Sequence, residues 1–207
     1  MKRFKHPRTF HVPHSPGATQ DDKIHKNLSF FENKEIVITE KRDGECTSLY
    51  SDGYIHARSI DGTSHPWQHY LKNKWSSLFQ DLPVGWRIVG ENLYARHSIE
   101  YNNLYDYFEV FAIFNNENIA LSWDEMVDWC ELYDLRPVPL LWRGVFDKTM
   151  LNTFHHLLST EQQEGYVMRV SSRIQHWSKE TAKWVRSNHV SSDEHWTKKW
   201  QKNTLQR

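Results

Sequence analysis

The stretch Ile36-Val37-Ile38-Thr39-Glu40-Lys41-Arg42-Asp43-Gly44-Glu45 joins a β-branched run to a charged turn. Val, Ile and Thr favour strands, and Asp-Gly is a strong turn signal between two strands. Lys41 is therefore expected where a strand meets a turn, with its amine held near the strand end. A lone Lys-x-Asp-Gly is more often a solvated surface hairpin than a site, so the rest of the chain must decide between these interpretations.

The segments around this stretch predict mainly strands. Three early strands with turns at Asp43-Gly44 and Asp52-Gly53 predict a meander of hairpins over residues 36–41, 45–50 and 54–58. Strands are also expected at residues 86–94, at 105–114, after the polar run 161–164, and as a short proline-containing edge at 135–141. Residues 181–186 fit either a strand or a helix end.

Helices are expected between these strands. Aromatic and leucine side chains recur at helical spacing over residues 65–80, which predicts an amphipathic helix. Ser122 and Glu125 fit a capping box, and Asp147 can cap a helix that ends near Ser159. These strands and helices belong to the α+β class that is predicted for this chain.

Composition favours one domain without a membrane span. The 207 residues are 38% hydrophobic and 14% aromatic, enough for a sizeable core. No apolar run approaches the roughly 18–20 residues that cross a bilayer, and no apolar stretch follows the basic N-terminus as in a secretory signal. Cys46 and Cys130 lie far apart, which is typical of reduced cytoplasmic thiols.

Charge is distributed unevenly on a chain whose net charge is zero. Residues 89–134 hold ten acids and one arginine, whereas residues 173–207 hold eight Lys or Arg and three acids. Residues 1–26 are also basic. This asymmetry permits a local phosphate-binding surface on a neutral protein, although uneven solvated faces would give the same counts.

The two ends of the chain are predicted to have little strand structure, unlike its centre. The leader (residues 1–27) contains three prolines and is expected to be irregular, and its Ser15-Pro16-Gly17 segment is either a linker or a lip over a site. Residues 190–207 are expected to form a basic helical tail. No repeat or long linker divides the chain, so residues 1–207 are predicted to form a single domain.

Six short pieces follow one another along the chain: Glu40-Lys41-x-Asp43-Gly44, Ala57-Arg58-Ser59, Gly90-Glu91-Asn92, Phe108-Glu109-Val110-Phe111-Ala112-Ile113, Glu164-Gly165-Tyr166-Val167 and Lys183-Trp184-Val185-Arg186. The series resembles the covalent nucleotidyltransferase superfamily of polynucleotide ligases and capping enzymes. It is most similar to the ATP-dependent RNA ligases of phages and bacteria, which include the double-strand RNA ligases. The leader resembles one found ahead of the nucleophile in such members, and the resemblance extends from about Lys5 to His189. It implies the nucleotidyltransferase (ATP-grasp-like ligase adenylation) fold, with antiparallel sheets flanked by helices.

The resemblance implies covalent catalysis. Lys41 would attack the α-phosphate of ATP, expel pyrophosphate and hold AMP as a phosphoramidate. AMP would pass to the 5′-phosphate of an RNA end, and the 3′-hydroxyl of a second end would then displace it. Neighbouring cations and a Mg²⁺ or Mn²⁺ ion are expected to lower the pKa of Lys41, because only the neutral amine is nucleophilic.

The resemblance also assigns roles to residues. The catalytic residues would be Lys41, Lys183 and Glu164, with Glu164 also holding the metal. The ATP-binding residues would be Glu40, Lys41, Arg58, Glu91, Phe111, Glu164, Lys183 and Arg186. Taken singly, several have simpler explanations: a strand-end arginine, a salt-bridged acid or a core phenylalanine. Alternation further predicts that Glu109, Phe111 and Ile113 share one face of their strand.

Two features depart from the family pattern. The last motif commonly holds two lysines one residue apart, so the second cation here is either Arg186 or Lys179. Only 24 residues follow Lys183, which leads us to expect no OB domain or other C-terminal domain. The basic tail, with Lys198, Lys199, Lys202, Trp196 and Trp200, is therefore expected to contact nucleic acid.

With this resemblance, the sequence predicts a cytoplasmic, monomeric RNA ligase of a bacterium or a phage-infected cell, acting in RNA repair on nicked duplexes or broken strand ends. An end-healing kinase or phosphatase is the expected type of partner protein. The alternatives are another covalent nucleotidyltransferase (a DNA ligase or guanylyltransferase) and a catalytically degenerate module that only binds RNA ends.

Overall fold

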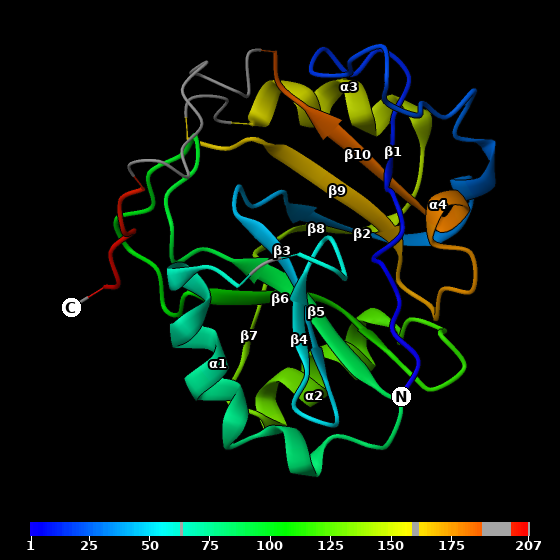
Figure 1. Ribbon diagram of the computed structural model, residues 1–207. Coiled ribbons are helices and arrows are strands. Elements are labelled where there is room, and N and C mark those ends of the chain that lie inside the picture. Colours follow the sequence, from blue (N-terminus) through cyan, green and yellow to red (C-terminus); the bar gives the residue numbers. More distant parts are fainter. Residues whose placement is uncertain (63, 159–161, 188–199, 207) are drawn as a thin grey trace.

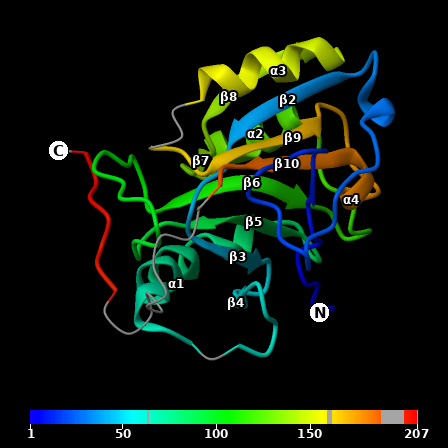
Figure 2. The ribbon, with the colours of Figure 1, turned by 90° about the horizontal axis from the view of Figure 1, so that it is seen from above.

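The computed structural model describes residues 1–62, 64–158, 162–187 and 200–206. Two five-stranded sheets lie one above the other, with helices on their outer faces (Figures 1 and 2). The α+β class predicted from the sequence is confirmed. Among the described residues, no helix is long and apolar enough to cross a membrane.

The first sheet has the strand order β1-β10-β9-β2-β8. Neighbouring strands are antiparallel except for β1, which runs parallel to β10. Its strands are β1 (Phe10–His11), β2 (Glu35–Glu40), β8 (Leu140–Val145), β9 (Gly165–Val170) and β10 (Thr181–Val185). The leader is therefore irregular apart from β1, which adds an unexpected edge strand to this sheet.

The second sheet has the order β4-β3-β5-β6-β7, and only β7 runs parallel to its neighbour. Its strands are β3 (Glu45–Tyr50), β4 (Ile55–Ala57), β5 (Arg87–Asn92), β6 (Phe108–Phe114) and β7 (Arg136–Pro137). The edge strand expected at 135–141 is thus two strands, because β7 joins the second sheet and β8 the first.

Helices close the outer faces of the sheets. The α-helices are α1 (His69–Ser76), α2 (Trp123–Leu132), α3 (Lys148–Leu157) and α4 (Trp177–Glu180), and the 3₁₀ helices are η1 (Ser29–Phe31), η2 (Pro66–Gln68) and η3 (Phe79–Asp81). The expected helix at 65–80 is divided among η2, α1 and η3. Both predicted caps are present: Ser122 and Glu125 exchange hydrogen bonds, and Asp147 accepts one from Thr149.

Side-chain alternation gives each sheet one apolar outer face and one inner face. On the first sheet, Ile36, Ile38 and Met168 lie in the same buried cluster as the α3 residues Leu151 and Phe154. The residues next to them in sequence, among them Thr39, Val167 and Arg169, line a cavity between the sheets. Apolar residues of α1 and α2 pack with those of the second sheet in another cluster.

The predicted meander is wrong at its first turn. Strands β2, β3 and β4 form where expected, but β2 pairs with β8 and β9, whereas β3 pairs with β4 and β5. Asp43-Gly44 therefore carries the chain from one sheet to the other instead of closing a hairpin. Gly44 is required there, since a Cβ would lie 2.6 Å from the carbonyl oxygen of Asn92.

The described end of the tail is extended, not helical. We call residues 200–206 the strap; it makes isolated bridges from Lys202 to Ala95 and from Leu205 to Leu104. Residues 188–199 and 207, including Lys198, Lys199 and Trp196, lie outside the described residues. Lys202 Nζ lies 4.8 Å from the ring centre of Tyr94, so this lysine packs on aromatic side chains of the protein itself.

Asn203 fastens the strap. Its side chain is 2% exposed, accepts a hydrogen bond from the Tyr101 amide at 2.9 Å and donates one to the Leu93 carbonyl at 2.8 Å. We expect Asn203→Ala to lower the free energy of unfolding by about 1–3 kcal/mol, because two buried backbone groups lose their partners. Urea denaturation measures this loss.

Gln206→Ala, which changes an exposed side chain of the same strap, is the matched control and should leave the unfolding midpoint unchanged. An Asn203→Ala variant as stable as the wild-type protein would show that the strap contributes nothing to the fold.

Candidate active site

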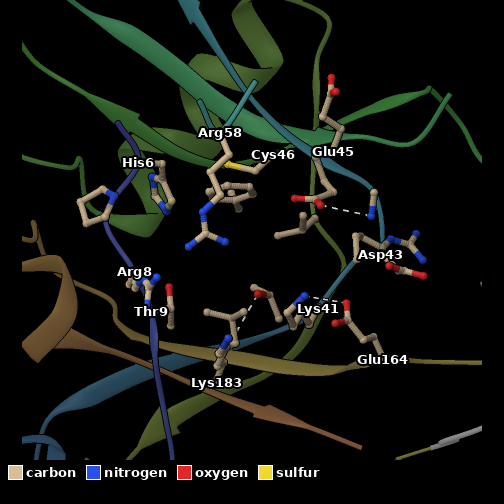
Figure 3. A pocket seen from close by; sticks show the side chains of 18 of the residues that line it. His6, Arg8, Thr9, Lys41, Asp43, Glu45, Cys46, Arg58, Glu164 and Lys183 are labelled. Atoms are coloured by element: carbon tan, nitrogen blue, oxygen red, sulfur yellow. Dashed lines mark hydrogen bonds and ion pairs between the residues drawn. The ribbon is translucent and has the colours of Figure 1, made fainter. Parts of the chain in front are cut away.

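A cavity of about 720 Å³ lies between the two sheets (Figure 3). Both sheets, the leader and the turn after β2 contribute to its lining. Seven of the eight predicted ATP-binding residues line it: Glu40, Lys41, Arg58, Glu91, Phe111, Glu164 and Lys183. These residues span most of the sequence, and the pairing of the strands is what brings them together.

Lys41 and Glu164 form an ion pair in this cavity. Lys41 follows β2 and Glu164 precedes β9, the strand beside β2, so the pairing places them next to each other. The Lys41 amide donates to the Gly165 carbonyl at 3.0 Å, and its Nζ donates to Oε2 of Glu164 at 2.6 Å. The two catalytic residues proposed for one end of the site are thus in direct contact.

The pKa of Lys41 is raised, opposite to our expectation. Burial lowers this pKa, but the carboxylates of Glu164, Glu91 and Asp43 outweigh that effect because they stabilise the ammonium form. The cations expected to lower the pKa of Lys41 do not dominate. In this structure Lys41 is therefore a protonated amine held by carboxylates.

Glu91 lies on β5 opposite this lysine. Its Oε1 accepts a hydrogen bond from the Gly44 amide at 3.1 Å, which links the second sheet to the turn after Lys41. Burial is the main reason that the pKa of Glu91 is raised to about 8. The positive charge of Lys41 lowers this pKa, but repulsion from Glu164 adds to the effect of burial. At neutral pH this carboxyl group is largely protonated and can donate a hydrogen bond.

Phe111 forms part of the cavity wall at an irregular point of β6. The register between β5 and β6 shifts so that Val110 pairs with Gly90 and Ala112 with Val89, leaving Phe111 as the extra residue of a bulge. The ring of Phe111 faces the cavity and packs edge-on against His6, with ring centres 5.2 Å apart.

The bulge overturns one prediction. Phe111 lines the cavity and Glu109 binds Arg42, which also lines it, but Ile113 packs in the cluster beneath the second sheet, with residues of α1 and α2. Phe114 instead shares the His6 contact with Phe111. Simple alternation fails because the extra residue reverses the faces beyond it.

Lys183 and Arg58 are the two predicted phosphate-binding cations that line the cavity besides Lys41. Lys183 on β10 has a lowered pKa, mainly because of burial and also because of the Lys41 charge, and its Nζ lies 3.7 Å from Oδ1 of Asp22 in the leader. Arg58 follows β4 and is exposed at the opening. Within the described part of the chain, Arg58 has no carboxylate partner.

Arg186, the eighth predicted residue, is not among the residues that line the cavity, and neither is Lys179. The Arg186 amide instead donates to the Glu164 carbonyl at 3.0 Å, so this residue supports Glu164 through its backbone. The second phosphate-binding cation beside Lys183 is therefore expected among the arginines that do line the cavity.

Sequence reasoning missed three such arginines: Arg8, Arg42 and Arg169. Arg42 donates to Glu40 at 2.8 Å and to Glu109 at 2.6 Å, which fixes the carboxylate of Glu40. Arg169 is buried and donates to backbone carbonyls. Arg8 lies in the leader segment that resembles the one ahead of the nucleophile in the family, but the sequence predicted no role for it.

Comparisons with known proteins agree with this geometry. The model of the family described as RNA ligase matches residues 34–185, well over half of the chain. No curated protein matches.

Solved structures of RNA ligases share the fold. A variant of Naegleria gruberi RNA ligase with ATP and Mn has a TM-score of 0.57 at 16% identity, covering 79% of this chain and 53% of that one. An archaeal ATP-dependent RNA ligase has a TM-score of 0.58 at 21% identity, covering 80% and 46%. Naegleria gruberi RNA ligase with PPi has a TM-score of 0.56 at 17% identity, covering 77% and 51%.

The chain spans about half the length of these ligases. At such identities the likeness establishes the nucleotidyltransferase fold of RNA ligases, as predicted, and the family match establishes the membership: this chain belongs to the RNA ligase family.

Proposed function

We propose that this protein is an ATP-dependent RNA ligase that joins 5′-phosphate and 3′-hydroxyl ends through lysyl-AMP and RNA-adenylate intermediates. The observation that carries the proposal is the Lys41–Glu164 pair at 2.6 Å, inside a cavity with an aromatic wall and a cationic opening. The solved ligases with ATP and Mn, or with PPi, support the same substrate class.

The cavity fits ATP in size and chemistry. Its volume of about 720 Å³ lies within the usual range for nucleotide-sized ligands. Phe111 offers a ring face for adenine, and Glu40, held by Arg42, offers a fixed acceptor for the base edge. Glu91 is placed for the ribose hydroxyls, and Arg58 and Lys183 for the phosphates.

Lys41 is the nucleophile in this proposal. Its amine must lose a proton before it attacks the α-phosphorus, and Glu164 is the nearest group that controls the proton. Lys183 and Arg58 offset the negative charge that develops on the α-phosphate and on the leaving pyrophosphate. The AMP then passes to the RNA 5′-phosphate, and the 3′-hydroxyl completes the phosphodiester.

Glu164 is the residue that would hold a divalent metal. No group of three or more metal-binding side chains occurs among the described residues, which fits Mg²⁺ because that ion keeps several waters and binds proteins through one or two carboxylates plus phosphates. Mg²⁺ or Mn²⁺, when bound, would neutralise phosphate charge.

We further propose a role in RNA repair, a monomeric state, a cytoplasmic location in a bacterium or phage-infected cell, and an end-healing kinase or phosphatase as partner. Nicked duplex RNA, RNA–DNA hybrids and single-stranded breaks are alternative substrates. Sealing assays on these three substrates with 5′-phosphate ends distinguish them.

The first prediction concerns the covalent intermediate. Incubation with ATP and Mg²⁺ should add one AMP to the intact mass, and Lys41→Ala and the charge-retaining Lys41→Arg should abolish the gain. Lys26→Ala, at an exposed lysine outside the cavity, should retain it. Label retained from GTP instead of ATP would favour a guanylyltransferase, and no adduct with either would favour a module that only binds RNA ends.

The second prediction concerns the pH dependence of lysyl-AMP formation. Glu164 raises the pKa of Lys41, and only the neutral amine attacks, so Glu164→Gln should shift the alkaline rise in rate to lower pH. The maximal rate should fall about tenfold or more, because a carboxylate beside the reacting phosphate is lost. Single-turnover assays with labelled ATP across a pH series measure both effects.

Glu117→Gln, at an exposed acid outside the cavity, is the control for this series. An alkaline rise that stayed in place, or moved to higher pH, would contradict the assignment of Glu164 as the group that holds the Lys41 proton.

The third prediction concerns Glu91 and stability. Its pKa is near 4.5 in an unfolded chain and about 8 in the folded protein, so the folded state retains a proton that the unfolded state releases between these values. The carboxyl group therefore lowers stability progressively as pH rises through that window. Glutamine does not titrate, so the melting temperature of Glu91→Gln minus that of the wild type should increase as pH rises.

Thermal unfolding at about pH 5.5, 7 and 8.5 measures this difference, with Glu117→Gln again as the control. A difference that was constant or shrank with rising pH would mean that Glu91 is charged in the folded protein.

A further inference from the structure

The leader forms one side of the cavity. Residues 5–9 and 21–23 line it together with the predicted site residues. At the second sheet, the Phe4 amide donates to the Tyr50 hydroxyl at 2.8 Å. The His6 ring then packs against Trp177 with centres 4.8 Å apart, and the Thr9 hydroxyl accepts a hydrogen bond from Trp177 at 2.9 Å. The leader thus crosses from one sheet to the other (Figure 1).

The leader is also fixed to the strand that carries Lys183. His11 pairs with Lys183 in the parallel β1–β10 contact, and the Gly17 amide donates to the Val185 carbonyl at 2.8 Å. A Cβ at position 17 would lie 2.4 Å from the carbonyl oxygen of Arg186, so this close approach requires glycine. Arg8, between His6 and Thr9, therefore extends from a braced backbone.

Arg8, like Arg58, has no acidic partner within the described part of the chain. Its guanidinium donates to the backbone carbonyl of Asp21 at 3.3 Å and is exposed. By contrast, Arg42 is paired with two glutamates, and Arg3 of the same leader forms a two-point pair with Asp52, at 3.0 and 2.6 Å. Unpaired guanidinium groups at a cavity are suited to bind phosphate oxygens in pairs.

Arg8 lies across the opening from Lys41. In Figure 3 the two occupy opposite sides of the open space, with Arg58 and Lys183 bordering the space between them. Lys5 and Lys23 are the other cations that the leader contributes to the lining. Cationic side chains therefore line the cavity from the Lys41 end to the leader, beside the carboxylates of Asp21 and Asp22.

The proposed function requires phosphate on this far side, and the following step rests on it. When Lys41 attacks the α-phosphorus, its nitrogen loses a proton, the bond from that phosphorus to the bridging oxygen breaks, and pyrophosphate leaves on the side opposite Lys41. Next, an oxygen of the RNA 5′-phosphate attacks the same phosphorus opposite Lys41, the P–N bond breaks, and the nitrogen regains a proton. The two phosphate groups therefore occupy one place in succession.

We propose that Arg8, with Lys5 and Lys23, forms a phosphate site at the leader edge of the cavity that holds the departing pyrophosphate and then the 5′-phosphate of the RNA. The leader is thus part of the binding site and not a linker. Arg8 supplies the main contact, because the leader braces it at His6 and Thr9 on either side.

Titration of the protein with inorganic pyrophosphate, followed by calorimetry, tests the site without any reaction. Arg8→Gln should weaken binding about tenfold, the effect of losing one strong charge-assisted contact. Arg3→Gln, which removes a leader arginine outside the cavity, should bind as the wild type does. Equal binding by Arg8→Gln and wild type would overturn the site.

Separate steps then test the two occupants. Arg8→Gln should raise about tenfold the pyrophosphate concentration that is needed to discharge lysyl-AMP. It should also raise about tenfold the concentration of 5′-phosphorylated nicked RNA that is needed to accept AMP. Arg3→Gln, outside the cavity, should leave both concentrations within about twofold of wild type. A change in only one of the two steps, or an equal change with Arg3→Gln, would overturn the shared site.

The test of the Arg8 phosphate site can fail or succeed independently of the test of the proposed ligase function. A wild-type protein that formed no lysyl-AMP would refute the ligase activity, and the pyrophosphate titration would still decide whether Arg8 holds phosphate.

Discussion

The carboxylate of Asp43 accepts hydrogen bonds from the amides of Ser98 and Ile99 at 2.7 and 2.9 Å, and the Asp43 amide donates to the Tyr101 hydroxyl at 3.0 Å. These three bonds fix the point at which the chain leaves the first sheet and enters the second. Because Lys41 lies two residues earlier, the same bonds set where its amine stands relative to the second sheet. The cavity exists because this turn separates two strands that a hairpin would have joined.

Charge within the cavity follows from that placement. The turn brings Lys41 between Glu164 of the first sheet and Glu91 of the second, and two carboxylates near one ammonium cannot both ionise without cost. The structure resolves this conflict by raising the pKa of Glu91 to about 8 and by keeping Lys41 protonated. As the nucleophile of the proposed reaction, Lys41 would stay inactive until a bound group changed the charge around Glu164. An amine that stays protonated until its partner binds suits a lysine that should react with one phosphate only.

Local signals in the sequence were sufficient for the strands and caps, whereas contacts between distant segments were not. Asp-Gly specifies a bend but not the partner of the next strand, so the pairing of β2 and β3 was predicted wrongly. The bulge at Phe111 depends on packing between β5 and β6. Arg186 lies three residues after Lys183, beyond the end of β10, where alternation directs a side chain to the opposite face. Motif order found seven residues of the cavity, and it could not find Arg8, whose position depends on ring contacts of the leader.

The segments outside residues 34–185, the part that matches the RNA ligase family, complete the site in this chain. The leader lies on one side of the cavity and attaches to β10, which carries Lys183. The strap lies on the other side of the turn, where Asn203 binds the backbone of Leu93 and Tyr101. Tyr101 in turn binds Asp43, so the strap supports the turn that positions Lys41. The two ends of the chain thus brace the turn after Lys41 and the strand of Lys183 separately.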